Sequence, residues 1–231
     1  MKLDQLKQAE EFNQIWETRY QPPYVTDSWV NNEWAKGRTE YLTFLIRVRK
    51  RKIIERIKKI QAELADYECI DSFPEEYFHI TVKELNYFLV AEKHFPDEYT
   101  EEELPKLIKS AQERLKPFKP FKLMLKNLNN FKSTVCVQAH DRGVIRNING
   151  ALLQIPGIQK LKNDYPRFLP HLSIAQYKST EDYEQLTQYL EHNRETKVGS
   201  LKVDSIKLVI AELPINGRYP KLKDLEEFSL G

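Results

Sequence analysis

The sequence is poor in the residues that build metal clusters, disulfide frameworks and phosphate-binding loops. Its 231 residues include two cysteines, Cys69 and Cys136, and seven glycines. Two distant cysteines form no metal or redox motif, and they favour a reducing compartment in which thiols stay free. Seven scattered glycines leave no Walker-type loop, and no His/Cys cluster or paired-carboxylate motif is present. The sequence therefore predicts neither a metal nor another cofactor.

Long apolar runs and a large excess of one charge are also missing. The longest apolar stretches fall far short of a membrane span, and the N-terminal region lacks the apolar block of a signal peptide. We therefore expect a soluble, cytoplasmic protein with no membrane partner. Lys and Arg number 36 against 34 Asp and Glu, which is too balanced for nucleic-acid binding that depends on bulk charge. Any contact with RNA must come from a local patch.

The most informative feature is a short motif that occurs twice. Phe78-His79-Ile80-Thr81-Val82 has a counterpart in Pro170-His171-Leu172-Ser173-Ile174. Because alternate side chains of a strand share a face, each histidine lies beside a hydroxyl while its apolar neighbours pack on the other face. Two imidazoles can serve as acid and base in phosphodiester cleavage, and the hydroxyls can donate to the phosphate oxygens. The alternative, strand filler in a duplicated fold, does not explain why both copies keep a polar pair.

The motifs lie within a repeat of strand, helix, strand, helix and strand. Leu45 lies 34 residues before His79 (79 − 45), and Val137 lies 34 residues before His171 (171 − 137). The predicted strands include 41–48, 78–85, 121–128, 133–138 and 201–211, and the predicted helices are 53–64, 101–115, 144–153 and 180–192. We predict an α+β fold: a bilobal, pseudo-twofold duplication with two largely antiparallel sheets facing a central cleft and helices outside. The lobes are expected at roughly 41–128 and 129–231, and an exchange of strands between them stays open.

Residues 1–40 differ in composition from the 41–231 domain that follows. All three tryptophans and the pair Pro22-Pro23 fall here. The apolar residues that fit one helical stripe are Leu3, Leu6, Phe12, Ile15 and Trp16, and the proline pair ends that helix. We predict a helical, Trp-rich extension that caps an otherwise exposed face of the main domain. A role in covering substrate or binding a partner is the alternative.

These residues resemble a known family, the two-histidine (2H) phosphoesterases, which include 2'-5' RNA ligase-like proteins and cyclic phosphodiesterases of RNA or nucleotides. The resemblance covers roughly residues 41–220. It rests on the two motifs, their matched lead-in elements and the closing strand Val209-Ile210-Ala211-Glu212 followed by Gly217-Arg218-Tyr219. It implies that both motifs lie in one cleft, that His79 and His171 exchange the roles of base and acid, and that Thr81 and Ser173 hold phosphate oxygens.

Four more residues are candidates for substrate binding. Lys83 continues the alternation of the first motif and could add positive charge beside the phosphate, although a strand-end lysine reaching solvent is the simpler interpretation. Tyr177 could bind phosphate or stack on a base, or it could be a rim aromatic. Phe44 lines the cleft or fills the core, with the core favoured, and Tyr219 follows the closing strand. The basic run 49–52 is either a solvated helix face or a phosphate contact.

Three classes of function remain open at this point. The favoured one is a phosphoric diester hydrolase, a monomeric, metal-independent enzyme that acts on a 2',3'-cyclic or 2'-5' linked ribose phosphate of an RNA end or a nucleotide. Joining of 2'-5' RNA ends would be the reverse of the same chemistry. The alternatives are a module that binds an RNA end or nucleotide without turnover, and a scaffold in which the Trp-rich N-terminal region carries the function. The three histidines outside the motifs, His94, His140 and His192, are interpreted as solvated.

Overall fold

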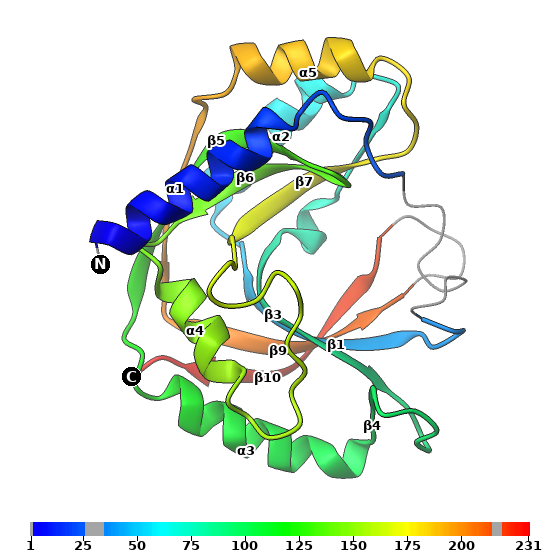
Figure 1. The fold of residues 1–231 in the computed structure, drawn as a ribbon, viewed down its shortest axis with the longest axis vertical. Coiled ribbons are helices and arrows are strands. Elements are labelled where there is room, and N and C mark those ends of the chain that lie inside the picture. Colours follow the sequence, from blue (N-terminus) through cyan, green and yellow to red (C-terminus); the bar gives the residue numbers. More distant parts are fainter. Residues whose placement is uncertain (1, 26–34, 214–218) are drawn as a thin grey trace.

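The computed structural model describes residues 2–25, 35–213 and 219–231, which form two five-stranded sheets and five helices (Figure 1). Sheet A has the order β10 (Lys221–Ser229), β9 (Ser205–Glu212), β1 (Glu40–Arg47), β3 (His79–Leu89) and β4 (Glu98–Tyr99). Sheet B has the order β2 (Ile70–Ser72), β7 (His171–Tyr177), β6 (Thr134–His140), β5 (Phe121–Phe131) and β8 (Lys197–Val203). Every ladder is antiparallel except the short pairing of β3 with β4. The predicted α+β fold with two largely antiparallel sheets is confirmed.

The two sheets correspond strand by strand, and each half of the chain supplies two strands to the other sheet: β2 and β5 lie in sheet B, and β9 and β10 lie in sheet A. Read from the opposite edge, sheet B runs β8-β5-β6-β7-β2 and matches β10-β9-β1-β3-β4 of sheet A. The two histidine strands, β3 and β7, therefore occupy equivalent positions. The prediction of one strand over 201–211 is wrong, because the chain changes sheets at Asp204: β8 pairs with β5, and β9 pairs with β1. Strand β10 was not predicted at all.

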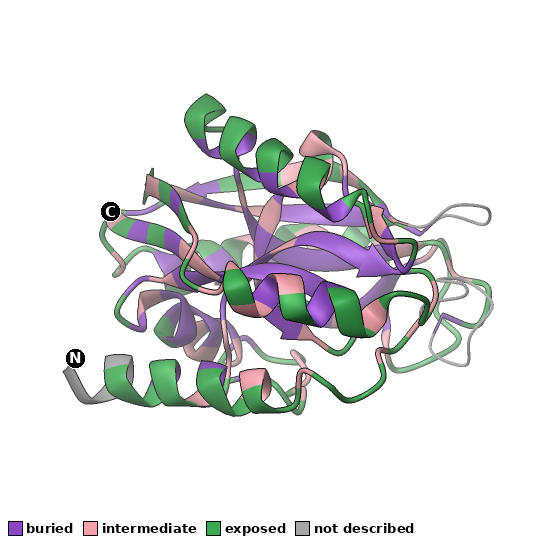
Figure 2. Cartoon of the chain, turned by 90° about the horizontal axis from the view of Figure 1, so that it is seen from above, coloured by how far each residue is buried: buried purple, intermediate pink, exposed green. Residues whose placement is uncertain are grey.

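Four helices complete the repeat with bounds near the predicted ones. They are α2 (Arg51–Leu64), α3 (Leu104–Leu115), α4 (Val144–Leu152) and α5 (Tyr183–His192). Helix α2 packs on sheet B, whereas α3 and α4 pack on sheet A. Each helix buries an apolar stripe, which in α2 is Ile53, Ile54, Ile57, Ile60 and Leu64. Figure 2 shows helices with one exposed and one buried side, as three- and four-residue spacing predicts.

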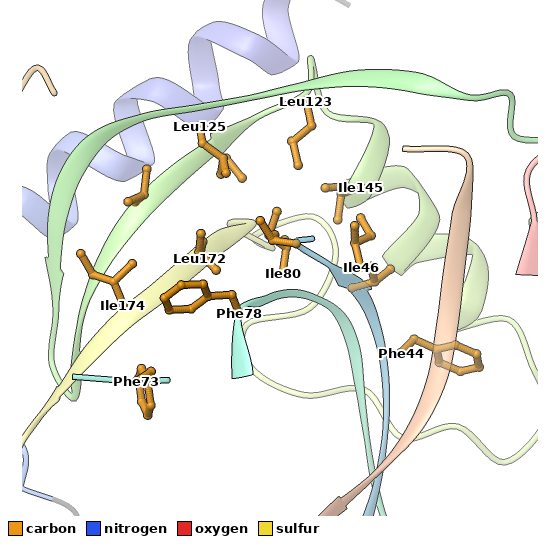
Figure 3. Packing of buried hydrophobic residues seen from close by; sticks show 14 of the residues in the cluster. Phe44, Ile46, Phe73, Phe78, Ile80, Leu123, Leu125, Ile145, Leu172 and Ile174 are labelled. Carbon is orange, nitrogen blue, oxygen red and sulfur yellow. The ribbon is translucent and has the colours of Figure 1, made fainter. Parts of the chain in front are cut away.

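The apolar neighbours of the histidines join the two sheets in one core. Ile80 of β3 and Leu172 of β7 are fully buried and lie close together, with Phe78 beside them and Ile145 of α4 nearby (Figure 3). Burying side chains of this size contributes about 1.5–3 kcal/mol each. The core thus holds the starts of the two histidine strands next to each other.

Each histidine strand has a β-bulge at the same distance from its histidine. Phe44 faces Lys83 and Leu45 faces Thr81, so Val82 is an extra residue in β3. In sheet B, Val135 faces Ala175 and Cys136 faces Ser173, so Ile174 is the extra residue in β7. A bulge changes which face the following side chains occupy. The alternation that holds within each motif therefore does not continue beyond it.

Helix α1 (Lys2–Glu17) forms the predicted helical extension and packs against β5. Phe12 is fully buried and Trp16 is half-buried, as the predicted stripe requires. Leu6 is 69% exposed, so the prediction that it belongs to the buried stripe is wrong. The side chain of Leu3, and Trp29 and Trp34, lie outside the residues that the structure describes.

Candidate active site

His79 and His171 begin equivalent strands, and the same backbone contact orients both rings. His79 Nδ1 lies 2.6 Å from the carbonyl oxygen of Tyr77, and His171 Nδ1 lies 2.8 Å from that of Leu169. A carbonyl oxygen can only accept, so each Nδ1 carries the proton and donates it. In the neutral ring Nε2 is then the basic nitrogen. Two half-buried imidazoles thus share one tautomer and one mode of anchoring.

Burial favours the neutral form of both imidazoles. It lowers the pKa of His79 to about 4, against the opposing effect of the Tyr77 carbonyl. The positive charges of Arg47 and Arg49, and that of His171 when its ring is protonated, lower this pKa further. Burial also lowers the pKa of His171, again opposed by its backbone bond. Ile80 and Leu172, which follow the two histidines, lie close together in the core, so the histidines begin neighbouring strands.

An aromatic ring packs against each imidazole. The ring of Tyr77 meets His79 edge to face, with centroids 4.8 Å apart, and Phe131 lies 4.4 Å from His171. Tyr77 also contacts Phe73 and Tyr219, with centroids at 4.6 and 5.6 Å. The candidate Tyr219 is therefore in the aromatic group beside His79. Sequence reasoning missed Tyr77 and Phe131, since neither residue belongs to a repeated pattern.

The motif hydroxyls lie on the partly exposed side of their strands. Thr81 and Ser173 are both half-buried, like the histidines two residues before them. Ser173 Oγ donates to Thr134 Oγ1 over 3.3 Å, which places a further hydroxyl from β6 beside the second motif. Hydroxyl donors in this position can bind the non-bridging oxygens of a phosphate.

Three of the four further candidates for substrate binding lie in the protein interior. Lys83 is fully buried and its Nζ lies 2.8 Å from Asp164, so both the solvent-reaching interpretation and a phosphate contact are wrong. Tyr177 is 1% exposed and donates to Asn130 over 2.6 Å, which excludes a rim position. Phe44 is fully buried against Phe228, as the favoured core interpretation predicted. The bulges explain the first two errors, because Lys83 and Tyr177 follow them.

Arginines near His79 add positive charge to this side of the site. Arg47 faces His79 across the β1–β3 ladder, and its guanidinium binds Asp224 at 2.6 Å. Arg49, the first residue of the basic run, donates to the carbonyls of Glu75 and Glu76. It also lines a surface pocket of about 610 Å³, which is formed by Arg49, Lys58, Gln61, Pro74, Glu75 and Glu76 and by neither motif histidine. The run is therefore tied mostly to protein groups.

Outside the motifs, one histidine differs from expectation. His140 is half-buried beside Phe12, with ring centroids 5.7 Å apart, and burial lowers its pKa to about 4. The prediction that it is solvated is wrong. Over the described parts of the chain, no group of three or more His, Cys, Asp or Glu side chains is arranged to hold a metal ion. No helix of the described chain is long and apolar enough to cross a bilayer.

The fold and the paired motifs define a class: a two-lobed α+β protein in which each lobe supplies one histidine and one hydroxyl. Residues 46–213 match the 2'-5' RNA ligase superfamily. The chain belongs to this family of 2H phosphoesterases, as its motifs predicted. A comparison with curated proteins gave no match.

Solved structures share the fold at low sequence identity. The Thermus thermophilus protein TT0787 is 18% identical, with a TM-score of 0.60 over 82% of this chain and 97% of that chain. Escherichia coli LigT in complex with 3'-AMP is 17% identical, with a TM-score of 0.55 over 83% and 98% of the two chains. LigT with NADP+ is 16% identical, with a TM-score of 0.54 over 84% and 98%. Each of these alignments leaves out between 16% and 18% of this chain (100 − 84 and 100 − 82).

Proposed function

We propose that this chain is a metal-independent phosphodiesterase that hydrolyses a 2',3'-cyclic or 2'-5' linked ribose phosphate of RNA or of a nucleotide. The observation that carries the proposal is the matched anchoring of His79 and His171 through Nδ1. It gives two Nε2 atoms of the same tautomer on equivalent strands. Family membership and the nucleotide complexes of LigT support a nucleotide-like substrate.

One imidazole acts as base and the other as acid. The neutral Nε2 of one histidine takes a proton from water as the water oxygen bonds to phosphorus, and the protonated partner gives its proton to the departing ribose oxygen. Each role contributes about 10²–10⁴-fold to the rate. Because burial favours the neutral form of both free rings, one of them gains its proton as the substrate binds, when the negative charge of the phosphate raises its pKa. Thr81 and Ser173 donate to the oxygens on which charge accumulates.

The test is an assay with excess chelator over a panel of 2',3'-cyclic and 2'-5' linked substrates. We expect turnover of at least one substrate, unchanged by chelator, and a loss of at least ~100-fold in both His79→Ala and His171→Ala. The double variant should be little worse than the poorer single one, because the two residues act as a unit. Binding without turnover in the wild type, with affinity retained in one histidine variant, would favour the binding module instead.

A further inference from the structure

Helix α1 lies on the motif-bearing face of sheet B. Gln138 is the cross-strand neighbour of His171, so the two side chains share a face. Phe131 contacts the His171 ring on that face, and Phe12 of α1 lies 6.5 Å from Phe131, centroid to centroid. In Figure 3 the core residues Leu123 and Leu125 of β5 point away from the pale blue ribbon of α1, which lies on the other side of that strand. The helix therefore covers the surface next to a proposed catalytic residue.

Contacts at several points hold α1 in this place. The carbonyl of Phe12 accepts a bond from Asn129 of β5 over 3.1 Å. Glu11 forms an ion pair with Arg146 of α4. Beyond the end of the helix, Arg19 binds Glu191 of α5 at 2.6 Å. The helix and the residues that follow it are thus tied to three different elements, β5, α4 and α5.

The surface beneath α1 is polar and cationic. The side-chain amide of Gln138 satisfies its neighbours when its oxygen faces Asn129 and Arg194. In that orientation the oxygen accepts hydrogen bonds from both residues, and the nitrogen donates to His140 Nε2. Trp16 covers Arg194, whose guanidinium carbon lies 4.4 Å from the indole centroid. Among the described residues no carboxylate forms an ion pair with Arg194. Asn129 and Gln138 are 0% and 2% exposed. They lie on the side of sheet B that α1 covers, where amide and guanidinium groups could otherwise bind a nucleic-acid backbone.

The family match does not include α1, since it begins at residue 46. We infer that α1 is a wall that closes the sheet B side of the site and restricts the substrate to a cyclic mononucleotide. An RNA strand running from the reacting phosphate across β6 and β5 would need the surface that Phe12 and Trp16 occupy. This inference rests on the proposed phosphodiesterase function and narrows its substrate class.

The test compares two substrates in full-length variants: adenosine 2',3'-cyclic phosphate, and a short oligoribonucleotide ending in a 2',3'-cyclic phosphate. Glu11→Lys places a positive charge beside Arg146 and should loosen α1. Glu10→Lys makes the same charge change at the preceding, exposed position and serves as the matched control. Phe12→Ala/Trp16→Ala removes the apolar contacts by a second route. Hydrogen exchange of the α1 amides reports whether the helix has been loosened.

We expect the wild type and Glu10→Lys to prefer the mononucleotide. In Glu11→Lys and in the double variant, the ratio of kcat/KM for the oligonucleotide to that for the mononucleotide should rise about tenfold or more. Two results would refute the role of α1 as a wall and leave the proposed function unaffected. One is a wild type that prefers the oligonucleotide, and the other is an unchanged ratio of the two kcat/KM values in variants whose α1 is loosened. Absence of turnover of both substrates by every protein would overturn the 2',3'-cyclic form of the proposed function, and the wall with it.

Discussion

Replacing Lys83 by methionine should destabilise the protein by about 3–5 kcal/mol, because it leaves a buried carboxylate without its counter-charge. Lys83 and Asp164 are 0% and 3% exposed, and Nζ lies 2.8 Å from Oδ2. Asp164 would keep the donors Asn149 Nδ2 at 3.0 Å and Leu161 N at 2.7 Å. These bonds partly stabilise the lone carboxylate, so the loss should fall toward the lower end of that range.

Urea denaturation followed by circular dichroism measures the free energy of unfolding, with unchanged slopes indicating a comparable transition. Lys122→Met is the matched control, because Lys122 is an exposed lysine in a strand and should change stability by less than about 0.5 kcal/mol. Lys83→Met/Asp164→Leu removes both charges and should recover much of the loss. A cost below about 1 kcal/mol for Lys83→Met alone would refute this account of the pair.

Three further predictions concern the site. Thr81→Ala and Ser173→Ala should each lower kcat/KM by an amount equivalent to about 1.5–4 kcal/mol, and full turnover in both would make the hydroxyls strand filler. Burial lowers the pKa of both histidines in the free protein, so the histidine that acts as acid loses its proton at a lower pH. As the pH rises, kcat/KM should therefore begin to fall below the ordinary histidine pKa of ~6.5, and a kcat/KM that still rises from pH 7 to 9 would contradict this. The unfolded chain binds a proton at His79 more readily than the folded protein does. The stabilising contribution of His79 should therefore be fully present above pH ~6.5, and the free energy of unfolding should decline by on the order of 3 kcal/mol as the pH falls toward the folded pKa of about 4. Urea midpoints of wild type and His79→Asn over that range measure the contribution, and identical pH dependence would disprove it.

Local patterns predicted the parts of the fold that depend on neighbouring residues. The 34-residue spacing of Leu45 to His79 and of Val137 to His171 predicted equivalent histidine strands, and the structure places β3 and β7 at equivalent positions. The isoleucine stripe of α2 predicted its buried face. These features follow from periodicity within one element, which the sequence displays directly.

The errors fall where partners are distant in sequence. A bulge depends on the register between two strands, so Lys83 was assigned to the wrong face although its own strand was predicted. Residues 207–212 pair with β1 and residues 205–212 with β10, which no local pattern reveals, so the sequence does not predict the change of sheet at Asp204. Phe131 reaches His171, 40 residues along the chain (171 − 131), through tertiary packing. Tyr77 lies two residues before His79, but no repeated pattern marks it.

The exchange of strands between the two sheets affects how the chain folds. Phe44 of β1 is paired with Leu208 of β9, and β9 in turn with β10, so sheet A lacks two of its five strands until nearly the whole chain is available. During synthesis from the N-terminus, the edge of β1 that pairs with β9 has no partner until about 160 further residues have been made. Such long-range pairing slows folding and exposes an unpaired strand in the meantime. Neither half forms an independent unit, so a fragment of residues 40–131 should stay unfolded alone and gain structure only when the fragment of residues 132–231 is added.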